Sequence, residues 1–127
     1  MGDRSVSKRR QPRLCESDAV EEPGTVKRKL VVFVPREALD VVREALFAAG
    51  AGRMGNYERC SWYTEGTGTF LAGKDTAPTV GRRGREERVS ELRLETVYPV
   101  ERQDEVVRAL REAHPYEEPA FDLYPLA

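Results

Sequence analysis

Apolar residues follow first a strand pattern and then a helix pattern in the stretch that begins near Lys27. Residues 30–34 form a continuous, β-branched apolar run, which predicts a strand buried on both faces. Pro35 ends this run and suits the first turn of a helix. Apolar residues at helical spacing, opposite a charged face, predict that helix: Leu39, Val42, Ala45, Leu46 and Ala49. Gly50 follows, where a helix C-terminus favours a positive φ.

The middle of the chain predicts two strands joined by a tight turn. Residues 57–64 are rich in aromatic and strand-favouring side chains, and Glu65 and Gly66 offer a two-residue turn. Residues 67–71 then read as the returning strand of a hairpin. The loop predicted at 72–84 is long, and such loops are often functional.

A second strand–helix unit completes the pattern. Residues 92–98 alternate between apolar and polar side chains, which predicts a half-buried strand. Pro99 opens a helix that His114 and Pro115 stop, and residues 120–124 form a short final strand. A shift of 64 residues superposes the two units, and it places Pro35 on Pro99. The same shift matches core positions of identical type: Leu30 with Leu94, Val42 with Val106, Ala45 with Ala109, Leu46 with Leu110 and Ala49 with Ala113.

Two such units predict one α+β domain, a ferredoxin-like split β-α-β sandwich with an extra hairpin strand around residues 67–71. The 127 residues are enough for one domain. Residues 1–26 are polar and lack a hydrophobic period, so we predict a disordered tail there and the folded domain at 27–127. The helices cover one face of the sheet, and packing of the other face across a homotrimer would bury it.

Charge and cysteine content narrow the classes of partner and compartment. The net charge of −1 provides no global field toward nucleic acid or anionic membrane, although the basic residues of the tail, Arg9 and Arg10 among them, leave a local nucleic-acid contact open. The chain has no apolar run of membrane-spanning length and no signal-peptide pattern. Cys15 and Cys60 form neither a disulfide framework nor a metal-ligand spacing, so we expect a reducing cytoplasm.

Several motifs, in order, resemble the YqfO-like family. They are Gly52-Arg53-Met54-Gly55-Asn56-Tyr57, Cys60-Ser61, Thr64-Glu65-Gly66-Thr67-Gly68-Thr69-Phe70 and His114-Pro115-Tyr116-Glu117-Glu118-Pro119-Ala120. In that family the module occurs as an insert in the Nif-three-like dinuclear-metal proteins and as short stand-alone proteins. The resemblance implies a fold of the CutA/PII type and a trimer. The flanking domain that holds the two metals in the larger relatives is absent from this sequence, so the dinuclear site is not carried over.

Two groups of residues are candidates for a site. His114, with Glu117 and Cys60, has the chemistry to bind a divalent metal ion. The alternative is that His114 ends a helix, where the helix dipole favours it. Asn56 and the stretch Glu65, Gly66, Thr67, Gly68 and Thr69 are candidate ligand-binding residues, because a Gly- and hydroxyl-rich segment can present backbone N–H groups to an anion. A tight hairpin explains the same glycines. By analogy with ligand clefts between the subunits of PII-like trimers, Lys74, Arg82 and Arg83 of the long loop could line an anion site.

The sequence therefore leaves three functions open. The first is a non-enzymatic trimeric module that binds a small ligand or a divalent metal ion, or that holds a partner. The second is an accessory chain of a metal-dependent hydrolase of the Nif-three-like type. The third is nucleic-acid binding through the basic tail, for which the weak net charge gives little support.

Overall fold

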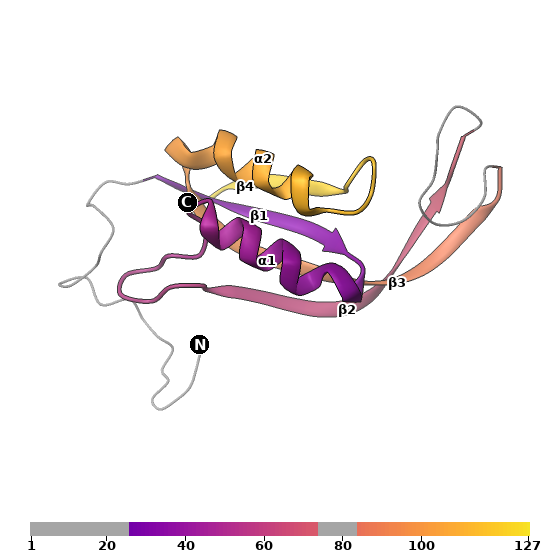
Figure 1. The fold of residues 1–127 in the computed structure, drawn as a ribbon, viewed down its shortest axis with the longest axis horizontal. Coiled ribbons are helices and arrows are strands. Elements are labelled where there is room, and N and C mark those ends of the chain that lie inside the picture. The colour runs from indigo at the N-terminus through magenta and orange to yellow at the C-terminus, as the bar shows by residue number, and fades with distance from the viewer. Residues whose placement is uncertain (1–25, 74–83) are drawn as a thin grey trace.

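Four strands and two α-helices build the described part of the chain, which in this computed structural model comprises residues 26–73 and 84–127 (Figure 1). In chain order, with two 3₁₀ turns labelled η, the elements are β1 (Lys27–Val34), η2 (Arg36–Ala38), α1 (Leu39–Ala48), β2 (Ser61–Leu71), β3 (Glu86–Pro99), η3 (Val100–Arg102), α2 (Gln103–Ala113) and β4 (Phe121–Pro125). The predicted β-α-β-β-α-β order is confirmed.

The strands form one antiparallel sheet in the order β2-β3-β1-β4. Both helices lie on the same face of this sheet, side by side (Figure 1). We call the other face the open face, because no helix or strand of the described residues covers it. β3 is longer than β1, so its first half, Glu86–Glu91, pairs only with β2. These two strands therefore extend beyond the rest of the sheet as a two-stranded arm (Figure 1).

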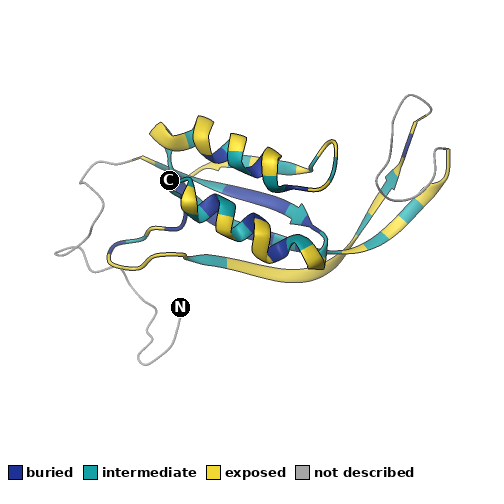
Figure 2. Ribbon diagram, in the orientation of Figure 1, coloured by how far each residue is buried: buried dark blue, intermediate teal, exposed yellow. Residues whose placement is uncertain are grey.

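The core lies between the sheet and the two helices. Alternate residues of β1 and β3 belong to it, and the apolar faces of α1 and α2 close it. Buried residues accordingly recur along both helices and in β1 (Figure 2). Its fully buried side chains include Leu30, Val32, Leu94, Tyr98, Val42, Leu46, Val106 and Leu110. Val31 and Phe33 have the opposite parity in β1, so they lie on the open face.

The 64-residue repeat predicted from the sequence is present in the structure. η2 and η3 are offset by 64 residues, and so are the first residues of α1 and α2, Leu39 and Gln103. Pro35 and Pro99 have the same extended conformation before these turns. Val31 pairs with Glu95 in the sheet, and these two residues are themselves 64 apart. A local two-fold axis therefore passes between β1 and β3 at this pair.

The predicted hairpin at Glu65 and Gly66 is wrong. β2 runs without a turn from Ser61 to Leu71, and each of its residues has a partner in β3, from Thr96 to Glu86. The extra hairpin strand at residues 67–71 is thus the second half of β2. Residues 65 and 66 remain extended because β3 continues beside them, and the antiparallel ladder gives them backbone hydrogen bonds that a turn would interrupt.

The helix ends agree with the sequence signals. Gly50 has a φ of 115°, and the N–H of Ala51 donates to the carbonyl of Leu46 at 3.0 Å, which closes the C-terminus of α1. At the end of α2, His114 is extended (φ −77°, ψ 136°) and its N–H still donates to the carbonyl of Leu110. Pro115 prevents the helix from continuing.

Part of the sequence-based prediction concerns residues outside the described ones. The tail at 1–25 and the loop residues Lys74, Arg82 and Arg83 are in this group, so the domain boundary at residues 26 and 27 and the anion site in that loop stay predictions. Among the described residues, neither α-helix has the length and apolar character that a membrane-spanning helix needs.

Candidate functional site

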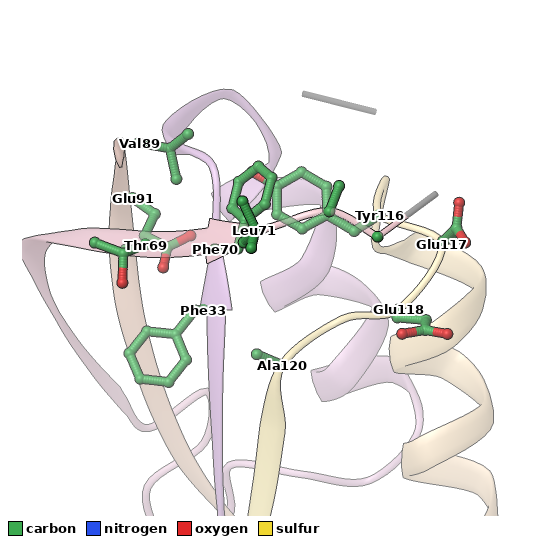
Figure 3. A pocket seen from close by; sticks show the side chains of 13 residues that line it. Phe33, Thr69, Phe70, Leu71, Val89, Glu91, Tyr116, Glu117, Glu118 and Ala120 are labelled. Atoms are coloured by element: carbon green, nitrogen blue, oxygen red, sulfur yellow. The ribbon is translucent and has the colours of Figure 1, made fainter. Parts of the chain in front are cut away.

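A pocket of about 310 Å³ lies on the open face, where the two-stranded arm leaves the sheet (Figure 3). Three segments meet there: the end of β1, the arm, and the loop between α2 and β4. We call it the Glu91 pocket and define it by Phe33, Phe70, Val89, Glu91 and Tyr116. A second cavity of about 360 Å³ adjoins it and shares Phe33, Gly68 and Glu91 with it.

Two glycines of β2 help to keep this part of the open face hollow. Gly66 and Gly68 pair with Glu91 and Val89, and the alternation of the strand places them on the open face. A Cβ at Gly68 would collide with the carboxylate of Glu91, whereas a Cβ at Gly66 would meet nothing within 4 Å. The Glu91 carboxylate therefore occupies the space that a side chain at residue 68 would fill.

Glu91 has no hydrogen-bond or ion-pair partner among the described residues. Its neighbour on the same face of β3, Arg93, instead donates from Nε to Glu95 Oε2 at 2.9 Å and lies over the ring of Phe33, 5.8 Å from its centroid. Lys29 Nζ donates to the other oxygen of Glu95 at 3.0 Å. Partial burial without a compensating cation raises the pKa of the Glu91 carboxyl.

His114 fixes the loop that forms one wall of the pocket. Its Nε2 is 2.7 Å from the carbonyl oxygen of Phe33, and its Nδ1 accepts a hydrogen bond from the N–H of Tyr116 at 3.1 Å. Because Nδ1 accepts, Nε2 carries the proton and donates to Phe33. Burial lowers the pKa of His114, although the hydrogen bond to Phe33 opposes this. His114 is thus a neutral side chain that ties the loop to the end of β1.

Tyr116 follows directly and brings its ring into the pocket. The His114 and Tyr116 rings lie 5.0 Å apart at a tilt of 58°. Burial, and then the negative charges of Glu91 and Glu37, raise the pKa of the Tyr116 hydroxyl. In Figure 3, Glu91 lies on one side of the pocket, and Glu117 and Glu118 lie on the other. Three carboxylates therefore border a pocket whose remaining walls are mostly apolar or aromatic.

The structure separates the predicted ligand-binding residues into two places. Residues 65–68 line the second cavity, and Gly68 and Thr69 line the Glu91 pocket. Asn56 lies in a turn between Met54 and Tyr57, near the start of β1 and thus at the other end of the sheet. Glu65 forms an ion pair with Arg36 at the start of η2. Residues 65–69 form a paired strand rather than a loop with converging N–H groups, so the geometry on which the predicted anion site depended is absent from them.

The predicted metal ligands do not converge in the described residues. His114 is bonded to Phe33, whereas Cys60 precedes β2 and its carbonyl accepts from Thr96, whose partner in β1 is Leu30. Phe33 lies three residue steps along β1 from Leu30, which corresponds to roughly 10 Å at about 3.3 Å per residue. Glu117 lines the Glu91 pocket, but the described residues contain no group of three or more His, Cys, Asp or Glu side chains placed to hold a metal ion.

Phe33, Phe70 and Glu91 line the Glu91 pocket, although no motif in the sequence marks them as site residues. The pair of glycines two residues apart was a usable signal, because it leaves one face of a strand bare. The residues that line the resulting space are distant in the sequence, and the sheet order brings them together.

Comparison with known proteins gives the chain clear relatives over part of their length. No protein-family model matches it. It is 52% identical over 98 residues to a Mycobacterium tuberculosis protein named GTP cyclohydrolase 1 type 2 homolog, and the match covers 77% of this chain and 26% of that protein. A solved Bacillus cereus protein related to NIF3 superposes with a TM-score of 0.71 at 46% identity, covering 80% of this chain and 26% of the other. The chain thus spans about a quarter of the length of these relatives.

Two shorter proteins share the fold. CutA from Synechococcus elongatus PCC7942 has a TM-score of 0.58 at 20% identity, over 87% of this chain and 83% of CutA. Bacillus subtilis GlnK has a TM-score of 0.53 at 14% identity, over 81% and 87% of the two chains. The predicted CutA/PII-type fold is confirmed. In sequence, the chain is similar to a segment that makes up about a quarter of the length of the NIF3-related protein and of the GTP cyclohydrolase 1 type 2 homolog.

Proposed function

We propose that this chain is a YqfO-like assembly and binding module that forms a homotrimer through its open face. The observation that carries the proposal is the contrast between the two faces of the sheet. The helices bury one face, whereas on the other Trp62 is 58% exposed and Tyr124 is 44% exposed. Val31, which is 1% exposed, and the ion-paired side chains of Lys29 and Glu95 lie between them in the sheet. Exposed aromatic side chains are enriched at protein–protein interfaces.

The sheet edges support a closed ring of copies. β2 and β4 are the edge strands of the described sheet, and each has one unpaired side. A contact between β2 of one copy and β4 of the next joins two different surfaces, and such a contact forms a closed ring when a pure rotation relates successive copies. The fold shared with CutA and the family resemblance, which implies a trimer, favour closure at three.

Mass measurement on the purified full chain tests the proposal. We expect light scattering after size exclusion to give three times the chain mass of 14.4 kDa at micromolar concentration. Trp62→Lys places a charge in the proposed interface and should give monomers, whereas Val41→Lys, on the exposed face of α1, should leave the trimer intact. A wild-type monomer, or a trimer that Trp62→Lys does not affect, would contradict the proposed interface.

The similarity to the proteins named GTP cyclohydrolase 1 type 2 homolog favours a second candidate, an accessory chain of a metal-dependent hydrolase. On this candidate the metal-binding part belongs to another chain. Metal analysis of the same purified sample separates the two candidates from a self-contained metal site. Stoichiometric metal that is lost in His114→Ala would establish such a site with His114 as a ligand.

A further inference from the structure

The described charged residues that line the Glu91 pocket are all acidic. Glu91, Glu117 and Glu118 line it, and none of its described lining residues is a lysine or arginine. Arg93, which faces the adjoining cavity, is paired with Glu95. Among the described residues, no cation pairs with the half-buried carboxylate of Glu91, and burial of an unpaired carboxylate costs free energy.

Aromatic and aliphatic side chains surround this carboxylate. Phe33, Phe70 and Tyr116 come from β1, β2 and the loop after α2, and Val89 and Ala120 complete the apolar walls (Figure 3). The faces of aromatic rings attract cations, and Phe33 already lies beneath the guanidinium of Arg93. A carboxylate among aromatic rings is suited to a cation that also carries apolar groups.

We propose that the Glu91 pocket binds a small organic ammonium ion, with the ammonium group at Glu91 and the hydrocarbon part against Phe33, Phe70 and Tyr116. A bare divalent metal ion fits less well, because it requires several oxygen ligands and the described residues offer no group of three such side chains. An anion would meet three carboxylates. The volume of about 310 Å³ lies at the lower end of the range for small-molecule sites, which limits the ligand to a modest size.

This site goes beyond the proposed assembly. The carboxylate and the aromatic rings proposed as its contacts are already brought together by the described residues of this chain. His114 is a positioning residue for it, because its two hydrogen bonds hold the backbone of Tyr116 to the end of β1.

Three probes of one shape and different charge test the proposal by calorimetry on the full chain at neutral pH. They are cyclohexylmethylammonium, its neutral isostere cyclohexylmethanol, and cyclohexanecarboxylate. We expect the ammonium probe to bind with one site per chain, the alcohol to bind at least about tenfold more weakly, and the carboxylate to show no binding. Equal affinity for the ammonium probe and the alcohol, or no binding of the ammonium probe, would overturn the proposal.

Matched variants locate the binding. Glu91→Gln keeps the shape of the side chain and removes its charge, so the affinity for the ammonium probe should fall at least about tenfold, to that for the alcohol. Glu101→Gln removes an exposed charge in η3, away from the pocket, and should leave the affinity unchanged. A Tm of Glu91→Gln at or above the wild-type value shows that the loss is not due to unfolding. Unchanged affinity in Glu91→Gln would assign the probe to another site.

The oligomeric mass of the same sample keeps this inference separate from the proposed assembly. A trimer that does not bind the ammonium probe contradicts only the ligand, and a monomer that binds it contradicts only the trimer.

Discussion

His114 uses both of its ring nitrogens inside the protein, which gives this single histidine a structural part in the fold. The side chain is 6% exposed, and its neutral form satisfies one donor and one acceptor. Protonation would add an N–H at Nδ1, where it would point at the N–H of Tyr116 and replace the acceptor of that hydrogen bond. The observed geometry therefore requires the neutral ring. The dipole argument for a charged histidine at the end of α2 therefore does not apply here.

Stability should accordingly decrease in mild acid. The folded-state pKa of His114 is lowered, so the unfolded chain binds more protons than the folded one as the pH falls below about 6.5. The stabilisation is complete above that pH and is lost as the pH falls through the folded-state pKa. Urea unfolding of the wild type at pH 7.5 and 5.5 should show this loss, and His114→Gln should show much less of it. An equal pH dependence in both proteins would exclude His114 as its source.

His114→Ala tests the same hydrogen bonds at constant pH. Removing both leaves the carbonyl of Phe33 and the N–H of Tyr116 without these partners, which should cost about 1–3 kcal/mol of unfolding free energy. Added chelator should leave the unfolding free energy of the wild type unchanged, because the role assigned to His114 here involves no metal.

At the scale of elements, one polar cluster joins two strands to a helix. Tyr98 in β3 is fully buried, and its hydroxyl donates to Gln103 Oε1 in α2 at 2.8 Å. Arg28 in β1 donates to the same oxygen at 2.6 Å. One amide oxygen thus accepts from both strands at the start of α2, which fixes the position of that helix over the sheet.

A double-mutant cycle measures this connection. Tyr98→Phe should cost about 0.5–1.5 kcal/mol, and Gln103→Leu should cost about 1–3 kcal/mol because it leaves the buried hydroxyl without its acceptor. The double variant should cost less than the sum by at least about 0.5 kcal/mol in urea unfolding. Tyr63→Phe, at a half-exposed residue of β2, is the control and should be close to neutral. Additive costs would show that the two side chains do not interact.

The elements differ in how well the sequence predicts them. Both helices and the buried halves of β1 and β3 follow from periodic apolar residues such as Leu92 and Leu94, because each faces the core. The arm does not, since its half of β3 packs against no helix and shows no strong apolar alternation. Glu65 and Gly66 resemble a turn locally, and only pairing with Leu92 and Glu91 makes them a straight strand. The two glycines of β2 signal a hollow on the strand, but the residues that form the walls of the Glu91 pocket do not follow from the sequence, because the sheet order brings them together.

At the scale of the whole molecule, the arm is the part with the least support. Residues 86–91 pair with β2 alone, while the later residues of β3 lie between β2 and β1 and above the core. Two-stranded ribbons are marginally stable in water without further packing. The arm of a single chain therefore has little to hold it closed, and a neighbouring copy in the proposed trimer would supply that packing.

Hydrogen exchange should show this gradient. In the Trp62→Lys variant, which we expect to be monomeric, amides of the arm should exchange at least about tenfold faster than those of Leu30 and Leu94. In the wild-type trimer the difference should become smaller. Mass spectrometry of peptides from residues 66–71 and 86–91 measures it. Equally slow exchange in the monomer would mean that the arm is stable without a neighbour.

The pairing of Val31 with Glu95 places the two strand–helix units around a local two-fold axis, and the chain joins these two units covalently. The second strand and helix repeat the first at several positions that the core buries, as Leu30 and Leu94 or Leu46 and Leu110 illustrate, whereas Val34 corresponds to Tyr98. A peptide of half this length, with one strand and one helix, would offer a copy of itself the same antiparallel ladder and the same facing helices. The segment that contains β2 connects the two units, so their strands pair within one chain rather than between two molecules. The residues of each unit that face outward can then differ without a change in the shared core.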